Sequence, residues 1–479
     1  MSPMMLNLRA ILPELYLGTM ALFLLMAAVF RHRRVSLPMI ASTLIALAAT
    51  GVFLLPHLGR PMPAFNGMLA VNDFVVFSQL IIISAALLTV LIAAHWLKQE
   101  GHPSEFLILL LLATLGMLLM VGASDLLTIY LPLEMSSLSL YVLAAFTREH
   151  AKSSEAGLKY FVLGALASGM LLFGISLVYG FAGTTNFAQL AQVFAAGTAS
   201  KGVTVGMILI IVGFCFKLSA VPFHMWTPDV YEGAPTPVTA FLATASKAAG
   251  FALFARFLML PFGHLAAQWQ QIIIFVSVAS MAVGALGAIM QSNFKRLLAY
   301  SSIGHAGFML MGLAAGSTAG VQAMLIYLAI YVFMSAGAFG CILLMRRGGR
   351  YVEDIRELAG LARTQPVMAL TLAIFMFSMA GIPPLAGFFG KLYVVLAAVD
   401  AGLVWLAVVG VIASVVGGYY YIKVVKIMYF DEPAGAFDAE AWPLLRAGIA
   451  LAAALTFLFF LMPTPLVAEA KIAAEALLH

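Results

Sequence analysis

Two lysines inside apolar segments are the residues of this sequence best suited to chemistry. Lys217 follows an apolar run, and Lys247 lies in a second apolar segment beyond prolines 222, 228, 235 and 237. A cation at the bilayer centre costs about 2.5–3.5 kcal/mol on insertion scales. A chain that keeps two such cations around a helix break is therefore expected to direct them at a polar path.

The chemistry that these lysines suit is proton transfer. Burial disfavours the charged ammonium and a neighbouring carboxylate favours it, so a lysine between these influences can load and release a proton near neutral pH. A static ion pair and a side chain that reaches the membrane surface are the alternatives. Lys217 lies too deep in its segment to reach the surface easily.

Three further charged residues extend this hypothesis. Glu134 lies mid-segment and is interpreted as a proton carrier or as a modulator of a nearby lysine, with a structural carboxylate as the alternative. Lys391 follows the Gly381–Pro384 helix break. It either holds the freed carbonyls there or forms the exit-side proton site. Lys159 either sets topology or serves as a second partner for Glu134.

Two histidines, His224 and His305, suit proton relay near physiological pH, although an intramembrane histidine is equally a hydrogen-bonded packing residue. Other polar residues are interpreted as helix-end or loop residues, namely Asp125, Asp229, Glu232 and Tyr300. The Tyr419–Lys423 segment is typical of an interfacial anchor.

The sequence lacks the motifs of redox and nucleotide chemistry. No G-x-G-x-x-G motif opens a helix after a strand, and no Cys or His set suits iron–sulfur, haem or zinc. Cys215 and Cys341 both lie in apolar runs. We therefore expect no cofactor or metal on this chain, and an energy source in a partner or an ion gradient.

Composition indicates what positions these side chains. Hydrophobic residues make up 63% of the chain and charged residues 9%, whereas about 25% charged is usual in soluble domains. Apolar runs of about 20 residues are long enough to span a bilayer. The sequence thus predicts an all-α polytopic protein, a single membrane domain over 1–479. Its fourteen expected spans are 11–30, 36–56, 74–96, 105–122, 124–146, 157–181, 205–231, 236–258, 272–291, 297–315, 321–345, 365–397, 402–427 and 443–462.

The distribution of positive charge predicts the orientation. Seventeen of the 25 Lys and Arg residues follow odd-numbered spans, beginning with Arg31, Arg33 and Arg34, and five lie on the other side. This asymmetry favours an even number of spans with both termini outside. The first span is expected to be retained, because no A-x-A-like cleavage site follows it.

Proline and glycine interrupt the seventh and twelfth spans. Corresponding broken helices indicate repeated units with an ion site at the breaks, and because the twelfth span follows the seventh by five positions, an odd number, the two units would have inverted topology. The expected divisions are three N-terminal helices, two repeats, and a last helix with a short tail, at 1–104, 105–258, 272–427 and 443–479. Residues 350–362 are expected to form a short amphipathic helix on the inside surface.

The sequence resembles the antiporter-like membrane subunits of proton-pumping NADH:quinone oxidoreductase, respiratory complex I. Within that family it is most similar to the bacterial subunit N branch, the counterpart of mitochondrial ND2. The resemblance covers nearly the whole chain. The segments that carry it are Tyr130–Tyr141, Leu158–Ala165, Lys217–Val238, Leu297–His305 and Gly381–Lys391.

The resemblance implies a function and assigns roles. Glu134, Lys217, Lys247 and Lys391 match the family's charged residues of helices 5, 7, 8 and 12, which would form a hydrated axis for protons across the membrane. FMN, iron–sulfur clusters and quinone would lie in partner subunits, and neighbouring antiporter-like subunits, lipid and protons would be the partners, without nucleic acid. The location would be a bacterial inner membrane with periplasmic termini.

Two other functions remain open at this point. A subunit of a multi-subunit cation/proton antiporter would share the lysines and broken helices. A purely scaffolding membrane subunit would tolerate the loss of those lysines.

Overall fold

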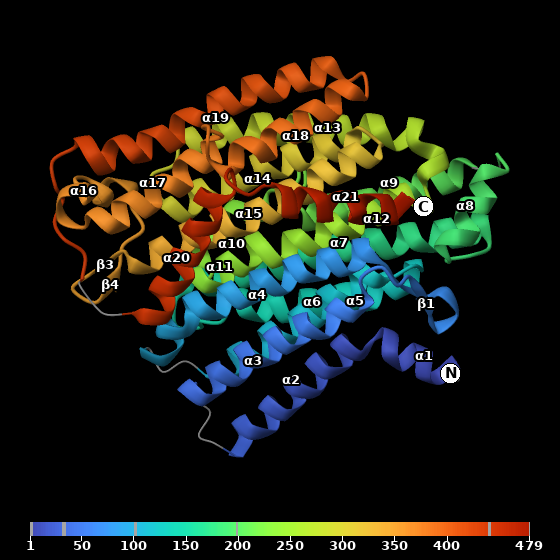
Figure 1. The fold of residues 1–479 in the computed structure, drawn as a ribbon, viewed down its shortest axis with the longest axis horizontal. Coiled ribbons are helices and arrows are strands. Elements are labelled where there is room, and N and C mark those ends of the chain that lie inside the picture. The colour runs from blue at the N-terminus through green and yellow to red at the C-terminus, as the bar shows by residue number, and fades with distance from the viewer. Residues whose placement is uncertain (1–2, 31–34, 100–102, 198–199, 439–441, 479) are drawn as a thin grey trace.

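The computed structural model describes residues 3–30, 35–99, 103–197, 200–438 and 442–478. The chain forms one bundle of long helices that run along a shared direction (Figure 1). Among the described residues, eleven helices are long and apolar enough to cross a membrane. The all-α membrane fold expected from composition is therefore confirmed.

Helices account for nearly all regular structure in the described residues. The α-helices are α1 (Pro3–Ala10), α2 (Leu12–Phe30), α3 (Leu37–Leu54), α4 (Asp73–Gln99), α5 (Glu105–Gly122), α6 (Leu126–Ala144), α7 (Ala151–Ala182), α8 (Phe187–Ala195), α9 (Lys201–Lys217), α10 (Trp226–Gly233), α11 (Thr236–Phe241), α12 (Lys247–Met259), α13 (Ala266–Ile289), α14 (Phe294–Ala314), α15 (Thr318–Leu344), α16 (Leu361–Thr364), α17 (Pro366–Ala380), α18 (Ala386–Asp400), α19 (Val404–Phe430), α20 (Pro443–Leu458) and α21 (Thr464–Leu478).

Each predicted span has helical structure at its position, but the count of fourteen stays a prediction. The two broken spans correspond to α9 with α10 and to α17 with α18. The last predicted span corresponds to α20, which has 16 residues. None of these shorter helices is long enough to count as a crossing by itself.

Both termini lie at the same end of the bundle (Figure 1). Near the C-terminus, the carbonyl of Ala476 in α21 accepts a hydrogen bond from Asn72 Nδ2 at 3.0 Å, just before α4. Near the N-terminus, Asn7 Oδ1 accepts from the Phe65 backbone at 2.9 Å. This is the termini end, which also carries α8 and the β1–β2 hairpin (Met62–Ala64 and Leu69–Val71).

At the opposite end of the bundle, one expectation from the sequence is wrong. This end is called the hairpin end, after the second hairpin of the chain, which lies there. Residues 350–362 do not form an amphipathic helix. Strand β3 (Arg346–Arg347) pairs with β4 (Arg350–Tyr351), and a 3-10 turn (Ile355–Leu358) leads into α16. The reason is local, because the turn between the strands is formed by two glycines with positive φ at 348 and 349.

Two other expectations from the sequence concern regions near the two ends of the chain. The segment after α20 is a helix, α21, which packs against α4 and α15, so it is not merely a short tail. The basic residues Arg31, Arg33 and Arg34 lie outside the described residues.

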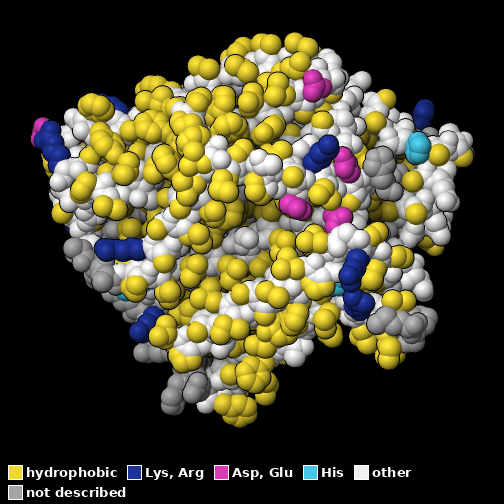
Figure 2. Space-filling model, viewed as in Figure 1, with side chains coloured by type: hydrophobic (Ala, Val, Ile, Leu, Met, Phe, Trp, Pro, Cys, Tyr) yellow, Lys and Arg dark blue, Asp and Glu magenta, His cyan; other side chains and the backbone are white. Residues whose placement is uncertain are grey.

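Close helix packing surrounds the site. A Cβ on Gly284 of α13 would lie 2.4 Å from the Gly304 backbone nitrogen of α14, so only glycine permits this approach. Helices α12, α14 and α15 are almost wholly buried. Hydrophobic side chains cover much of the face displayed in Figure 2, as expected for a surface in contact with lipid.

Candidate functional site

The first helix break positions Lys217 at the end of α9. The chain turns over residues 218–225 before α10 continues. The carbonyl of Phe216 accepts a hydrogen bond from Trp226 Nε1 at 3.0 Å, and the Val221 backbone donates to Ser280 Oγ at 2.9 Å. Backbone groups freed by the break are thus bonded inside the protein, as intramembrane irregular structure requires.

Lys217 contacts one face of α6. Its Nζ donates to Ser137 Oγ at 2.5 Å and lies 5.4 Å from the centre of the Tyr141 ring. Glu134 precedes Ser137 by three residues and Tyr141 by seven, so all three share that helix face.

Glu134 forms no ion pair with Lys217 among the described residues, and it lies on the face of α6 that Lys217 contacts. Its Oε1 atom is buried and accepts no hydrogen bond. A buried carboxylate oxygen without a partner is costly, so this atom suits a bound water or a proton. The structure thus places Lys217 against the helix face that carries Glu134, and the proton-transfer roles of the two residues stay a prediction.

Lys247 is fully enclosed. It is 1% exposed and begins α12 directly after a π-turn at Leu242–Ser246, a local distortion that is frequent at functional sites. Its Nζ donates to the carbonyl of Ser302 on α14 at 2.9 Å. The Ser302 hydroxyl accepts from Tyr331 on α15 at 2.8 Å.

His305 lies one turn beyond Ser302 and is 3% exposed. Its Nδ1 and Nε2 atoms are hydrogen-bonded to the hydroxyls of Tyr327 and Tyr421 at 2.7 and 3.0 Å. Ser302, whose carbonyl bonds Lys247, precedes His305 by about one helical turn, and Lys391 lines the same cavity as His305. His305 therefore adjoins the surroundings of both lysines, with a hydrogen-bond partner on each nitrogen.

Lys391 lies at the second break. Helix α17 ends at Ala380, Gly381 adopts φ +86°, and α18 begins at Ala386. Lys391 Nζ donates to the freed Ala380 carbonyl at 2.8 Å and to Ser414 Oγ at 2.9 Å. Lys391 thus holds a carbonyl of the broken helix, which was one of its two expected roles, and this geometry is compatible with proton exchange as well.

A small cavity joins Lys391 to His305. It measures about 20 Å³ and is also lined by Ser301, Ser414 and Tyr421. This volume holds about one water molecule. His305 and Lys391 therefore share one cavity, and Lys247 is bonded to Ser302 on the helix that carries His305.

The remaining gap lies between Lys217 and Lys247. Among the described side chains, no hydrogen bond joins Lys217 and its partner Ser137 to Lys247 and its partner Ser302. Tyr231 of α10 lies near Ser302, and its hydroxyl is buried without a hydrogen-bond partner among the described residues. A buried hydroxyl of this kind suits a bound water.

Two predicted relay residues lie elsewhere. Lys159 pairs with Asp229 at 2.8 Å and with Glu155 at 2.6 Å, and within the part of the chain that the structure describes no hydrogen bond or ion pair joins it to Glu134. Asp229 is therefore part of an ion-pair cluster, which Arg296 joins at 2.6 Å. His224 lies in the first break, and its Nδ1 has no hydrogen-bond partner among the described residues.

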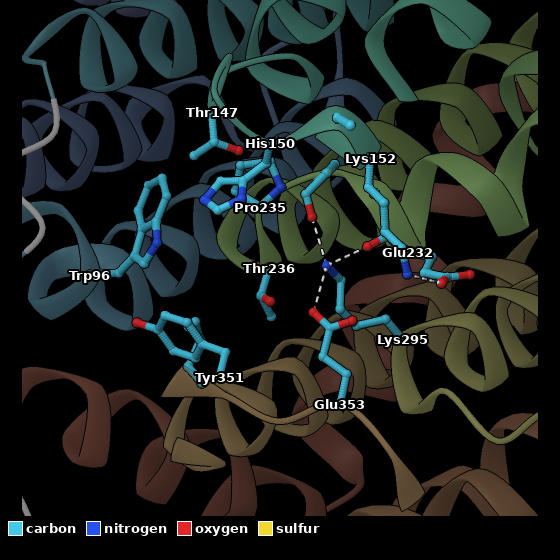
Figure 3. Close-up of a pocket in the computed structure, with 14 residues that line it drawn as sticks. Trp96, Thr147, His150, Lys152, Glu232, Pro235, Thr236, Lys295, Tyr351 and Glu353 are labelled. Atoms are coloured by element: carbon cyan, nitrogen blue, oxygen red, sulfur yellow. Dashed lines mark hydrogen bonds and ion pairs between the residues drawn. The ribbon is translucent and has the colours of Figure 1, made fainter. Parts of the chain in front are cut away.

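A polar cavity, called the vestibule, opens at the hairpin end, and Lys152 and Glu232 are among the residues that line it (Figure 3). The cavity measures about 340 Å³, and its lining includes His150, Lys152, Thr236 and Tyr351. Lys295, 3% exposed, donates to the carbonyls of Glu232 and Ala234 at 2.8 and 2.7 Å and pairs with Glu353 at 3.2 Å. Charged groups therefore line the surface of the bundle where α11 begins, and α11 leads along the chain to Lys247.

The sequence alone missed the hydroxyl groups that connect the charges. Tyr421 was expected to anchor the membrane surface, yet it is 2% exposed and bonds His305, whereas Tyr419 is 57% exposed. Tyr327 and Tyr331 lie four residues apart within an apolar span. That spacing, which places two hydroxyls on one helix face, was the available signal.

Fold and site define a class: a polytopic membrane protein with acid and base groups enclosed between two broken helices. The family described as "NADH:quinone oxidoreductase/Mrp antiporter, TM" matches residues 123–417. The chain belongs to this family. The matched region contains every predicted site residue.

Individual relatives agree with this assignment. NADH-quinone oxidoreductase subunit N of Rhodospirillum rubrum is 53% identical over 97% of this chain and 96% of its own length. A chain of respiratory complex I from Thermus thermophilus with bound aureothin is 33% identical, with 95% and 98% coverage and a TM-score of 0.83. A chain of the Mrp complex from Dietzia sp. shares the fold, with a TM-score of 0.81 at 22% identity and coverage of 99% of both chains.

Proposed function

We propose that this chain is the proton-translocating subunit N of an NADH-quinone oxidoreductase. The observation that carries the proposal is the enclosed arrangement of Lys247, His305 and Lys391, with Lys217 and Glu134 inside the same bundle. Similarity to subunit N over almost the whole chain supports the assignment. In this role the chain belongs to a translocase that couples NADH oxidation by quinone to proton transport.

Each group has a role in this proposal. Glu134 modulates Lys217, and a proton passes through water to Lys247, then by His305 to Lys391. Hydroxyls of serine and tyrosine orient the waters between them. The vestibule at the hairpin end supplies protons, and the termini end releases them.

The proposal places redox chemistry in other subunits. FMN, iron–sulfur clusters and quinone would be held by partners, and quinone reduction there would change the charge at one end of the row. No group of three or more His, Cys, Asp or Glu suited to a metal occurs among the described residues. The complex would lie in a bacterial inner membrane with the termini end facing the periplasm, as the basic loops indicate.

The second candidate is a subunit of a cation/proton antiporter. The fold shared with the Mrp complex chain favours it, whereas the higher identity to subunit N favours the first. Purification distinguishes them. Co-isolation with flavin and iron–sulfur subunits supports complex I, and sodium-dependent proton exchange without an electron donor supports the antiporter.

The test of the proposed function is proton yield per NADH in vesicles containing the purified complex. Lys217→Met and Lys391→Met are expected to lower NADH-driven acidification at least severalfold while the complex still assembles. Lys423→Met, at an exposed lysine of α19, is the matched control and should leave the yield unchanged. Normal yields in both Lys217→Met and Lys391→Met would refute the proposal.

A further inference from the structure

Arg256 is a buried cation outside the proton path proposed above. It lies in the last turn of α12 and is 1% exposed. Its Nη2 donates to the Ala123 carbonyl at 3.2 Å and to Ser124 Oγ at 2.7 Å. Among the described residues, its Nε and Nη1 atoms have no hydrogen-bond partner, and no carboxylate forms an ion pair with it. Because a guanidinium stays protonated in proteins, a fixed positive charge remains uncompensated there.

This charge lies between Lys247 and the termini end. Arg256 follows Lys247 by nine positions in α12, about 13 Å at about 1.5 Å per residue. The eight residues between them, 248–255, are all apolar and buried. Ala123 and Ser124, which hold the guanidinium, adjoin β2 through a bridge to Leu69 and so belong to the termini end.

The surroundings of Lys247 toward the hairpin end are different. The vestibule lies there, with Thr236 in its wall, and the segment from Thr236 to Lys247 also carries Thr239 and Thr244, whose hydroxyls donate to backbone carbonyls. Lys247 therefore has polar groups on one side and an apolar segment ending in a fixed positive charge on the other.

We propose that Arg256 is an electrostatic barrier that prevents protons from passing directly between Lys247 and the termini end. The inference rests on the proposed function, and it adds a residue that sets direction. A proton entering the apolar segment would approach a like charge in a low-dielectric interior, where repulsion is strong. Arginines and other fixed charges exclude protons from pores by the same means. Protons on Lys247 are thereby directed to His305 and Lys391.

The second lysine-bearing helix supports this asymmetry. Helix α18 also runs toward the termini end, and nine residues after Lys391 it ends at the exposed Asp400. The same spacing thus ends in a positive charge after Lys247 and in a negative one after Lys391. A carboxylate favours a departing proton, and a guanidinium opposes one.

Arg256 also has a structural contribution that the experiment must separate. It bonds the carbonyl that ends α5, and a cation near the end of α12 interacts favourably with that helix's dipole. Glutamine retains hydrogen-bond donors without the charge, and lysine retains the charge. If Arg256 has only a structural role, proton leakage should rise when its hydrogen bonds are lost. If Arg256 is a barrier, proton leakage should rise when its positive charge is lost.

The test is passive proton conductance of vesicles containing the whole complex, driven by a potassium diffusion potential without NADH. Arg256→Gln is expected to raise conductance at least fivefold, and Arg256→Lys to stay within twofold of the unchanged protein. Conductance in Arg256→Gln equal to that of the unchanged protein, or equal increases in both variants, would overturn the barrier.

A second pair of variants keeps Arg256 and covers the case in which Arg256→Gln fails to assemble. Ser124 is only partly buried, and its hydroxyl bonds the guanidinium directly. Ser124→Glu places a carboxylate against the guanidinium and should raise conductance severalfold, whereas Ser124→Gln should not. Equal conductance in Ser124→Glu and Ser124→Gln would overturn the proposal that Arg256 is a barrier. Lys217→Met in the same vesicles reports separately on the proposed function through NADH-driven yield.

Discussion

Replacing Gly387 by alanine should displace Lys391 without removing any ionisable group. A Cβ at this position would lie 1.9 Å from the Ser378 carbonyl oxygen, whereas ordinary contact begins at 3.4 Å. Helices α17 and α18 must therefore separate by about 1.5 Å, and overpacking of this kind costs about 1–3 kcal/mol.

The displacement reaches the site because Lys391 lies one turn after Gly387 on the same face of α18. Its Nζ lies 2.8 Å from the Ala380 carbonyl and 2.9 Å from Ser414 Oγ. A shift of about 1 Å or more carries such contacts beyond hydrogen-bond range. A freed Ala380 carbonyl and an unpaired ammonium would then add about 1–3 kcal/mol.

The assay is NADH-driven acidification per NADH oxidised, together with thermal unfolding of the purified complex. Gly387→Ala should lower both the proton yield and the unfolding temperature. Gly418→Ala on neighbouring α19 is the control, because its Cβ would meet nothing within 4 Å. A stable Gly387→Ala complex with full proton yield would refute the assignment of Lys391 to the path.

Three other predictions test separate parts of the structure. Tyr421→Phe removes a hydroxyl bonded to His305 and should slow NADH-driven pumping severalfold, measured against assembly on native gels. Asp125→Ala removes the N-cap of α6, which accepts two backbone hydrogen bonds, and should cost about 1–2 kcal/mol, measured by thermal unfolding. At the hairpin end, backbone hydrogen bonds from Gly349 and its neighbour hold the pKa of Asp438 below its ordinary value of 3.8. Because the folded pKa is the lower one, this contact is expected to persist above about pH 4 and to be lost as pH falls through the folded value, measured by hydrogen exchange of residues 346–351 at pH 7 and pH 3.

The sequence predicted the bundle and the charged residues because both depend on composition. An apolar run of about 20 residues has few alternatives to a membrane helix, and an isolated lysine within one is conspicuous. Both helix breaks followed from proline and glycine at 222 and at 381–384. The division into two inverted repeats was not tested and stays a prediction.

What sequence could not provide was side-chain direction and backbone distortion. Tyr421 and Tyr419 differ by two positions, yet one is buried against His305 and the other faces outward. Lys159 reaches Asp229 across two helices, a pairing that depends on tertiary packing. The π-turn before Lys247 has no reliable signature in a single sequence.

The central claim is that Glu134, Lys217, Lys247, His305 and Lys391 form one continuous proton path. The most direct measurement is a cryo-electron microscopy map of the complex at a resolution that shows ordered water. The account predicts water density between Lys217 and Lys247 beside Tyr231, and in the cavity between His305 and Lys391. A map with dry, apolar packing between Lys217 and Lys247 would contradict this account.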